Sequence, residues 1–166
     1  MSAHARKELV LSLDTAHLAE VRRAVLDLLA AGCFPPDDIQ LLALAVDEAV
    51  ANVMEHAYCG VAFQASHQVK VVMHLDTERF EVLILDRGRE FDPNTVPELD
   101  IRRHVQNGRK GGLGVFLIRR IMDEVNYTYR EDEHNELRLI KYVDKRIAKA
   151  RSKPTRRTEG VQKRCP

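Results

Sequence analysis

The sequence predicts an α+β domain in which helices cover one face of a largely antiparallel β-sheet. The chain has 166 residues and is 45% hydrophobic, so it can bury the core of one domain. Its apolar residues follow strand or helix periods in the order strand, helix, helix, strand, strand, loop, helix, strand, strand. Neighbouring strands in this order are close enough along the chain to pair as hairpins, which is typical of α+β domains.

The N-terminal elements are a short strand and a helix. Leucines alternate with other residues over positions 9–13, as in a strand. Asp14 or Thr15 can cap the helix that follows, and Gly32 can end it. The apolar stripe of this helix is Leu18, Val21, Val25, Leu28 and Leu29.

A second helix begins at Pro35 and Pro36. Prolines early in a helix and the carboxylates of Asp37 and Asp38 in its first turn are both favourable. The apolar stripe then runs through Ile39, Leu42, Val46, Ala49, Val53 and Ala57.

Two strands follow, QVKVVMHL at 68–75 and FEVLILD at 80–86, and residues 76–79 form the hairpin turn between them. The second run is apolar on both faces, which predicts a central strand.

The C-terminal elements come after a long loop at 87–111 that is rich in Gly and Pro. Long loops inside a domain are usually functional or disordered. We expect a helix at about 113–124 and a closing hairpin with strands at about 125–131 and 136–143.

Charge divides the chain into a domain at 1–144 and a basic tail at 145–166. The tail holds nine Lys or Arg and one Glu, a net charge of +8, and the whole chain carries +1, so residues 1–144 carry −7. An acidic body does not fit direct binding of nucleic acid, which needs basic residues on a folded face. The tail has almost no large apolar residues and is predicted to be solvated and mobile.

Nothing in the sequence predicts a membrane span, a secretory signal or a disulfide framework. No apolar run approaches the roughly 18–20 residues of a transmembrane helix. Cys33, Cys59 and Cys165 are odd in number and widely scattered. We therefore expect a cytoplasmic protein with reduced thiols.

The first candidate site lies on the second helix, in DEAVANVMEHAY. Glu48, Asn52 and His56 are four residues apart and lie along one helical stripe beside the apolar one. An amide oxygen together with phosphates can hold Mg²⁺. A nearby carboxylate can orient or deprotonate a hydroxyl. The alternative is that all three are ordinary polar helix residues, with His56 structural.

The second candidate site is DRGREFDP. Asp86 ends a strand that should be buried, where its carboxylate needs a donor such as the exocyclic amino group of a base. Gly88 lacks the side chain that would hold a ring away from the backbone. The alternative is a turn with Asp as the cap and Gly at positive φ.

The third candidate site is NGRKGGLGVFLI. Its glycines, including Gly111, Gly112 and Gly114, lead directly into a helix beginning near Leu113. Free backbone N–H groups at a helix N-terminus can bind an anion. The cations Arg109 and Lys110 lie just before this helix. The pattern matches neither the Walker A loop nor the Rossmann fingerprint, and a flexible connector is the alternative.

Taken in order over residues 8–143, these motifs resemble the Bergerat-fold ATPases of the GHKL superfamily, and within it the bacterial anti-sigma-factor serine kinases. DEAVANVMEHAY resembles the N-box, DRGREFDP the first glycine box and GGLGVFLI the second. The resemblance implies a two-layer sandwich, a mostly antiparallel mixed sheet with three helices on one face. It also implies that residues 1–144 are an ATP-binding kinase domain.

The resemblance implies roles for single residues. Glu48 would be the catalytic base and Asn52 the Mg²⁺ ligand. Asp86 would contact the adenine amino group, with Gly88 beneath the ring. Residues 109–114 (Arg109, Lys110, Gly111, Gly112, Leu113, Gly114) would bind the phosphates of ATP, with Gly112 and Gly114 as hinges.

The resemblance also implies partners: a sigma factor, and a STAS-domain antagonist whose serine is phosphorylated. A homodimer is compatible with the family. One departure concerns the last strand, where many members carry threonines near the adenine and this chain has Glu136 and Leu137 at roughly that place.

Three further functions are alternatives to phosphoryl transfer. One is a catalytically idle, ATP-gated module that sequesters a regulatory protein. The presence of Glu48 favours the kinase over this module. The catalytic domain of a sensor histidine kinase is disfavoured because no phosphoacceptor helix pair precedes residue 8. ATP-driven clamps need domains beyond 166 residues.

Overall fold

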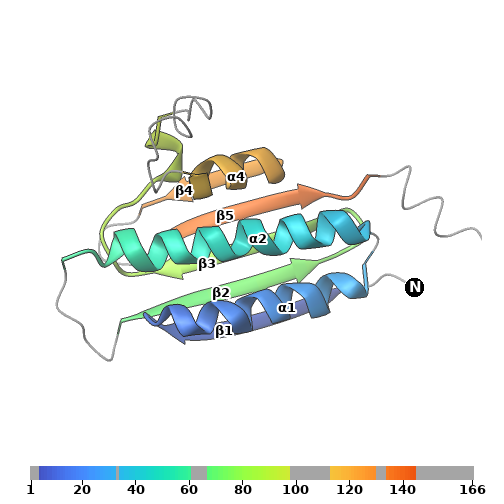
Figure 1. The fold of residues 1–166 in the computed structure, drawn as a ribbon, viewed down its shortest axis with the longest axis horizontal. Coiled ribbons are helices and arrows are strands. Elements are labelled where there is room, and N and C mark those ends of the chain that lie inside the picture. The colour runs from blue at the N-terminus through green and yellow to red at the C-terminus, as the bar shows by residue number, and fades with distance from the viewer. Residues whose placement is uncertain (1–3, 33, 61–66, 98–112, 130–133, 145–166) are drawn as a thin grey trace, which may run out of the picture.

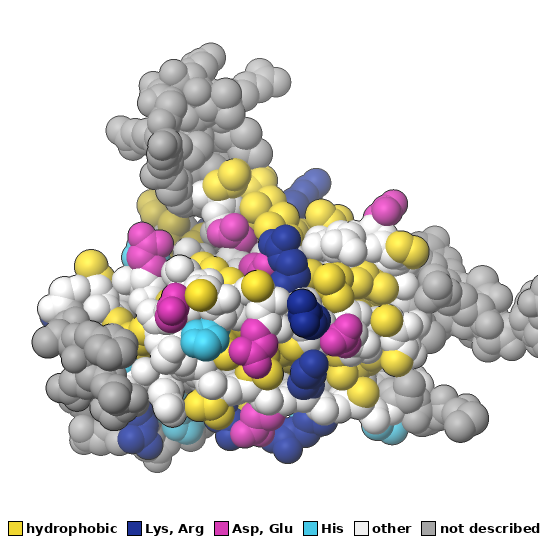
Figure 2. Space-filling view, turned by 60° about the horizontal axis from the view of Figure 1, so that its bottom comes forward, with side chains coloured by type: hydrophobic (Ala, Val, Ile, Leu, Met, Phe, Trp, Pro, Cys, Tyr) yellow, Lys and Arg dark blue, Asp and Glu magenta, His cyan; other side chains and the backbone are white. Residues whose placement is uncertain are grey.

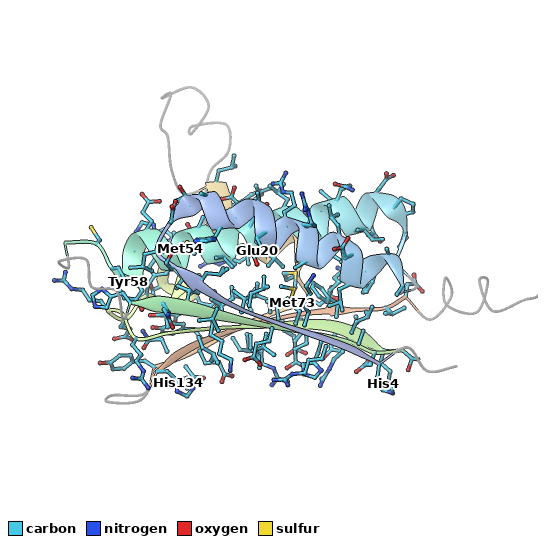
Figure 3. The ribbon with its side chains drawn as sticks, turned by 90° about the horizontal axis from the view of Figure 1, so that it is seen from below. His4, Glu20, Met54, Tyr58, Met73 and His134 are labelled. Carbon is cyan, nitrogen blue, oxygen red and sulfur yellow. The ribbon has the colours of Figure 1, made fainter. Side chains whose placement is uncertain are left out.

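A computed structural model of the chain describes residues 4–32, 34–60, 67–97, 113–129 and 134–144. They form two layers, a five-stranded sheet and three α-helices that pack on one of its faces (Figure 1). In the edge-on view of Figure 3 the helices lie on one side of the sheet, with side chains between the layers. The predicted α+β class is confirmed.

The strands are β1 (Ala5–Ser12), β2 (Gln68–Leu75), β3 (Arg79–Asp86), β4 (Glu124–Thr128) and β5 (Asn135–Tyr142). Their order in the sheet is β1-β2-β3-β5-β4, and each of these four pairings is antiparallel. β3 is therefore the central strand, as its apolar run predicts. Alternate β3 residues are buried, because successive side chains of a strand point to opposite faces.

The β2–β3 hairpin closes through Asp76, as predicted. Oδ1 of Asp76 accepts hydrogen bonds from the backbone N–H groups of Glu78 (2.7 Å) and Arg79 (2.8 Å). The Asp76 N–H donates to the carbonyl of Arg79 (3.0 Å). This side-chain turn fixes the register of β3 against β2 and so positions the far end of β3.

The helices are α1 (Leu18–Ala30), α2 (Pro36–Asn52) and α4 (Leu113–Ile121). Asp14 is the predicted cap, and its Oδ1 accepts from the Ala16 N–H at 2.9 Å. The capped turn is a 3₁₀ helix, η1 (Thr15–His17), so α1 begins three residues later than a helix starting at Thr15.

The second helix begins as predicted but ends differently. Pro35 is extended and Pro36 opens the helix, with Asp37 and Asp38 in the first turn. After Asn52 the chain passes into a π-helical segment, η2 (Val53–Ala57). π-Helical turns often occur at functional sites, since the wider turn redirects the side chains around it.

The core lies between the sheet and the helices. Its largest fully buried side chains include Leu11, Leu29, Leu42, Met73, Phe80, Ile84, Ile118 and Leu139. Figure 3 shows Met73 pointing from the sheet into this layer. Burying each such side chain contributes roughly 1.5–3 kcal/mol, which holds the helices in fixed positions over the sheet.

On the surface shown in Figure 2, acidic and basic side chains of the described residues are intermixed. An ion pair links two of the helices, since Arg22 on α1 donates to the Asp47 carboxylate on α2 at 2.5 Å. None of the described helices has the length and apolar character needed to cross a membrane.

Candidate functional site

Glu48 and Asn52, one helical turn apart on α2, lie against the start of α4. Both side chains are half-buried. A Cβ added to Gly114, the second residue of α4, would fall on Oε2 of Glu48 and 3.3 Å from Nδ2 of Asn52. The absence of a side chain at Gly114 therefore lets α4 approach this carboxylate and amide. Residues from two separate sequence motifs thus meet at one point.

The side-chain amide of Asn52 is free to contact a ligand. Its Nδ2 is buried and has no hydrogen-bond partner among the described residues. An unsatisfied buried polar group costs about 1–3 kcal/mol. A half-turn of the amide would exchange Nδ2 with the carbonyl oxygen, the kind of ligand that Mg²⁺ accepts. The residues at this point therefore fit a bound magnesium ion beside phosphates.

Asp86 is the last residue of β3 and points toward the helix layer. It is 5% exposed, and its Oδ1 accepts from the Gly88 N–H (2.7 Å) and from Nδ2 of Asn135 (3.0 Å). Burial raises the pKa of the Asp86 carboxyl above its ordinary value. These two hydrogen bonds and the nearby His134 oppose that rise. The buried strand-end carboxylate predicted from the sequence is thus present, and protein donors already engage one of its oxygens.

Asn135 was not among the predicted site residues. It is 2% exposed and lies directly opposite Asp86 in the β3–β5 ladder. Besides Asp86, its Nδ2 reaches the carbonyl oxygen of Gly88 at 3.1 Å. Asn135 thus connects the two residues of the second motif.

Glu136 and Leu137, which lie roughly where the family's threonines fall, point to opposite faces of the sheet. Glu136 pairs with Leu85, so it points to the sheet face away from the helices. The residue on the face of Asp86 is Asn135. The alternation in NELRLI could have shown this, because buried Leu137 shares its face with Asn135.

Gly88 packs against the end of η2. A Cβ at this position would lie 2.5 Å from the carbonyl oxygen of Ala57 and 2.6 Å from its Cβ. The neighbouring Arg89 N–H donates to the same carbonyl at 2.7 Å. Among the described residues positive φ occurs at Gly60 and not at Gly88, so close approach is the reason for this glycine.

Aromatic residues hold the loop after β3 against the same end of α2. The Arg87 N–H donates to the Tyr58 hydroxyl at 3.1 Å. The ring of His56 stacks on Phe91, with centroids 4.6 Å apart and planes 22° apart. The Phe91 N–H donates to the hydroxyl of Tyr127 at 3.0 Å. His56 therefore packs against this loop, which favours the structural role over a role in the site; the contact is a ring stack and not the hydrogen bond expected at the end of a helix.

The two groups of site residues lie at neighbouring places along one helix. Asn52 belongs to the group at α4, and Ala57 contacts the group at Asp86 and Gly88. These positions are five residues apart, and the π-helical segment η2 connects them. Figure 3 shows Tyr58 and His134 together at this end of the molecule, far from His4.

The remaining predicted site residues belong to the glycine-rich segment. Arg109, Lys110, Gly111 and Gly112 lie outside the described residues. Leu113 is the first residue of α4 and is 46% exposed. Leu113 therefore lies at a helix N-terminus, where the sequence predicts the anion site.

A cavity of about 620 Å³ opens beside Asp86. Its lining includes Tyr58, Lys70, Arg87 and His134, but neither Glu48 nor Asn52. Val10 and Lys70 come from the sheet face away from the helices. This cavity is therefore separate from the point where Glu48 and Asn52 meet α4.

Comparison with known proteins finds a matching family and several similar proteins. The model of the histidine kinase-like ATPase domain family matches residues 11–141. The serine-protein kinase RsbW of Halalkalibacterium halodurans is 33% identical over 113 residues, which are 66% of this chain and 65% of that protein. The serine-protein kinase RsbW of Bacillus cereus is 30% identical over 116 residues, 68% of this chain and 69% of that protein. The chain thus spans about two thirds of the length of these relatives.

A solved histidine kinase domain from the blue-light activated histidine kinase of Erythrobacter litoralis is similar at 20% identity, with a TM-score of 0.42. The match covers 82% of this chain and 67% of that one.

The chain belongs to the histidine kinase-like ATPase domain family, because the family model matches residues 11–141, which is most of its length.

Proposed function

We propose that the chain is an ATP-dependent protein serine kinase and anti-sigma factor of the cytoplasm. It binds a sigma factor and phosphorylates a serine of a STAS-domain antagonist. The observation that carries this proposal is the meeting of Glu48, Asn52 and Gly114 at one point of α2. The Asp86 and Gly88 group lies beside Ala57, five residues further along the same helical segment.

At the phosphate end, the side-chain oxygen of Asn52 would hold Mg²⁺, and the bound ion would supply positive charge to neutralise the β- and γ-phosphates. The Glu48 carboxylate, beside the start of α4, orients the hydroxyl of the partner's serine and accepts its proton. The N-terminus of α4 and the preceding Arg109 and Lys110 stabilise the phosphates.

At the base end, Asp86 accepts a hydrogen bond from the exocyclic amino group of adenine. Gly88 keeps the loop close to Ala57, so the base has a wall of fixed shape. The stacking of His56 on Phe91 keeps this loop in place from its other end.

The kinase activity is supported by the relatives. Two of them carry the name serine-protein kinase and share 30% and 33% identity with this chain. The family match ends at residue 141, which supports an ATP-binding domain over 1–144 with the basic segment 145–166 outside it. A homodimer is compatible with this assignment.

The test is incubation with Mg²⁺, γ-labelled ATP and purified STAS-domain proteins encoded near the gene. The expected result is label on a partner serine, lost in Glu48→Gln. Binding of a sigma factor that requires ATP, without label on any partner, would instead identify an ATP-gated binding module. Absence of ATP binding would refute the proposal as a whole.

A further inference from the structure

Asn135 uses both hydrogens of its side-chain amide inside the protein. Nδ2 lies 3.0 Å from Oδ1 of Asp86 and 3.1 Å from the carbonyl oxygen of Gly88. Both partners can only accept hydrogen bonds when Asp86 is ionised, so the group between them must be the NH₂ and not the carbonyl. At 2% exposure no water replaces these bonds easily.

This arrangement leaves the two oxygens of Asp86 unequal. Oδ1 accepts from Asn135 and also from the Gly88 N–H at 2.7 Å. It is therefore committed to the protein, and the carboxylate cannot rotate without breaking two hydrogen bonds. Oδ2 is the oxygen that remains to accept from a ligand.

We propose that Asn135 is a positioning residue for base selection: by holding Oδ1 of Asp86 and the Gly88 carbonyl together, it keeps Oδ2 as an ionised acceptor that selects a 6-amino purine over a 6-oxo purine. This inference rests on the proposed ATP-binding function and adds to it the residue that sets the selectivity.

The selectivity follows from hydrogen-bond complementarity. An ionised carboxylate can accept from the 6-amino group of adenine but meets the 6-oxo group of hypoxanthine as acceptor against acceptor. A protonated carboxyl would carry a hydrogen and could donate to the 6-oxo group. Loss of the Asn135 donor favours protonation, since a hydrogen bond to the charged form stabilises that form.

Other groups also act on Asp86 and must be considered. His134 precedes Asn135 on the β5 side and favours the ionised form. Arg87 follows Asp86 in the chain, and the hydroxyls of Tyr58 and Tyr127 approach from the end of η2 and from β4. His134 is present in every variant compared below, so its contribution to Asp86 is the same in all of them.

The test is calorimetric binding of the magnesium complexes of ATP and inosine triphosphate to the full chain between pH 5 and 8. The wild type should prefer ATP, with a preference that weakens only at the acid end. Asn135→Leu should weaken ATP binding about tenfold or more at pH 7.5, consistent with loss of one charge-assisted hydrogen bond. As the pH is lowered, this variant should lose its preference for ATP over inosine triphosphate at a distinctly higher pH than the wild type does.

Two variants separate positioning from general loosening of β5. Asn135→Thr keeps one donor, so its pH profile should lie between the other two. Leu139→Ala opens a cavity at a fully buried position on the same strand, and it should lower the melting temperature but keep the wild-type profile.

Superimposable pH profiles of the ATP preference in the wild type, Asn135→Leu and Asn135→Thr would overturn the inference while leaving the proposed function intact. If Asn135→Leu does not fold, the Asn135→Thr profile decides alone. Failure of the wild type to bind ATP at all would remove the proposed function first, so the two failures are distinguishable.

Discussion

Gly88→Ala offers a sharp test of how the loop after β3 is held. The added Cβ would lie 2.5 Å from the carbonyl oxygen of Ala57, 2.6 Å from its Cβ and 2.7 Å from its carbonyl carbon. None of these three atoms can move away by side-chain rotation, because two belong to the backbone and the Cβ is bonded directly to it. The loop and η2 must therefore separate.

The expected cost has two parts. Overpacking of a well-packed site costs about 1–3 kcal/mol. Separation also breaks or stretches the hydrogen bond from Arg89 to the Ala57 carbonyl, which is 2.7 Å long and worth about 1 kcal/mol. We expect a loss of roughly 2–4 kcal/mol, or about 5–12 °C in melting temperature for a domain of this size.

The assay is urea unfolding followed by far-ultraviolet circular dichroism, with the free energy extrapolated to water. Gly114→Ala is the matched control. Its Cβ would meet Oε2 of Glu48, the movable end of a side chain, while alanine improves helix propensity by up to about 1 kcal/mol. Gly114→Ala should therefore leave stability unchanged or raised and impair phosphoryl transfer. A Gly88→Ala protein as stable as the wild type would refute the reasoning.

The remaining predictions concern catalysis, metal binding and stability. Glu48→Gln should retain ATP binding but reduce transfer of label by about 10²-fold or more, and retained transfer would exclude its role as base. Asn52→Ala should remove the Mg²⁺-dependent part of nucleotide affinity in calorimetry, and an unchanged dependence on Mg²⁺ would exclude it as ligand. Burial raises the pKa of the Asp47 carboxyl despite its bond to Arg22. Asp47 therefore has a higher pKa in the folded chain than in the unfolded chain. The free energy of unfolding should fall as the pH rises from the unfolded-state pKa through the folded-state pKa. Asp47→Asn lacks this titration, so its free energy of unfolding should increase relative to that of the wild type over the same pH range. A difference between the two proteins that does not change with pH would contradict the assignment. Arg119 donates to two backbone carbonyls of the 93–96 segment, so Arg119→Met should cost about 2 kcal/mol in urea unfolding, whereas a loss below about 0.5 kcal/mol would show that these bonds contribute little.

The order of the elements could be predicted from the sequence because each has a clear period and clear end signals. Asp14 and Asp76 bond to nearby backbone N–H groups, so their roles depend on a few neighbouring residues. The central place of β3 followed from its apolar run, although in the structure helices cover only one face of the sheet (Figure 1) and the β3 side chains on the other face are half-buried.

Features that depend on distant contacts were not predicted. Asn135 is joined to Asp86 by the pairing of two strands 49 residues apart, and one residue of register decides which side chain faces the site. The π-helical turn at Val53–Ala57 has no local signal comparable to a cap. The reason for Gly88 is likewise its contact with Ala57, which lies far away in the sequence.

The most direct test of a single nucleotide site is a magnetic resonance titration of the ¹⁵N-labelled chain with Mg²⁺ and a non-hydrolysable ATP analogue. The side-chain amides of Asn52 and Asn135 and the backbone amides of Gly88 and Gly114 should shift together and saturate with one dissociation constant. Shifts confined to one of the two groups, or saturating with different constants, would contradict a shared site.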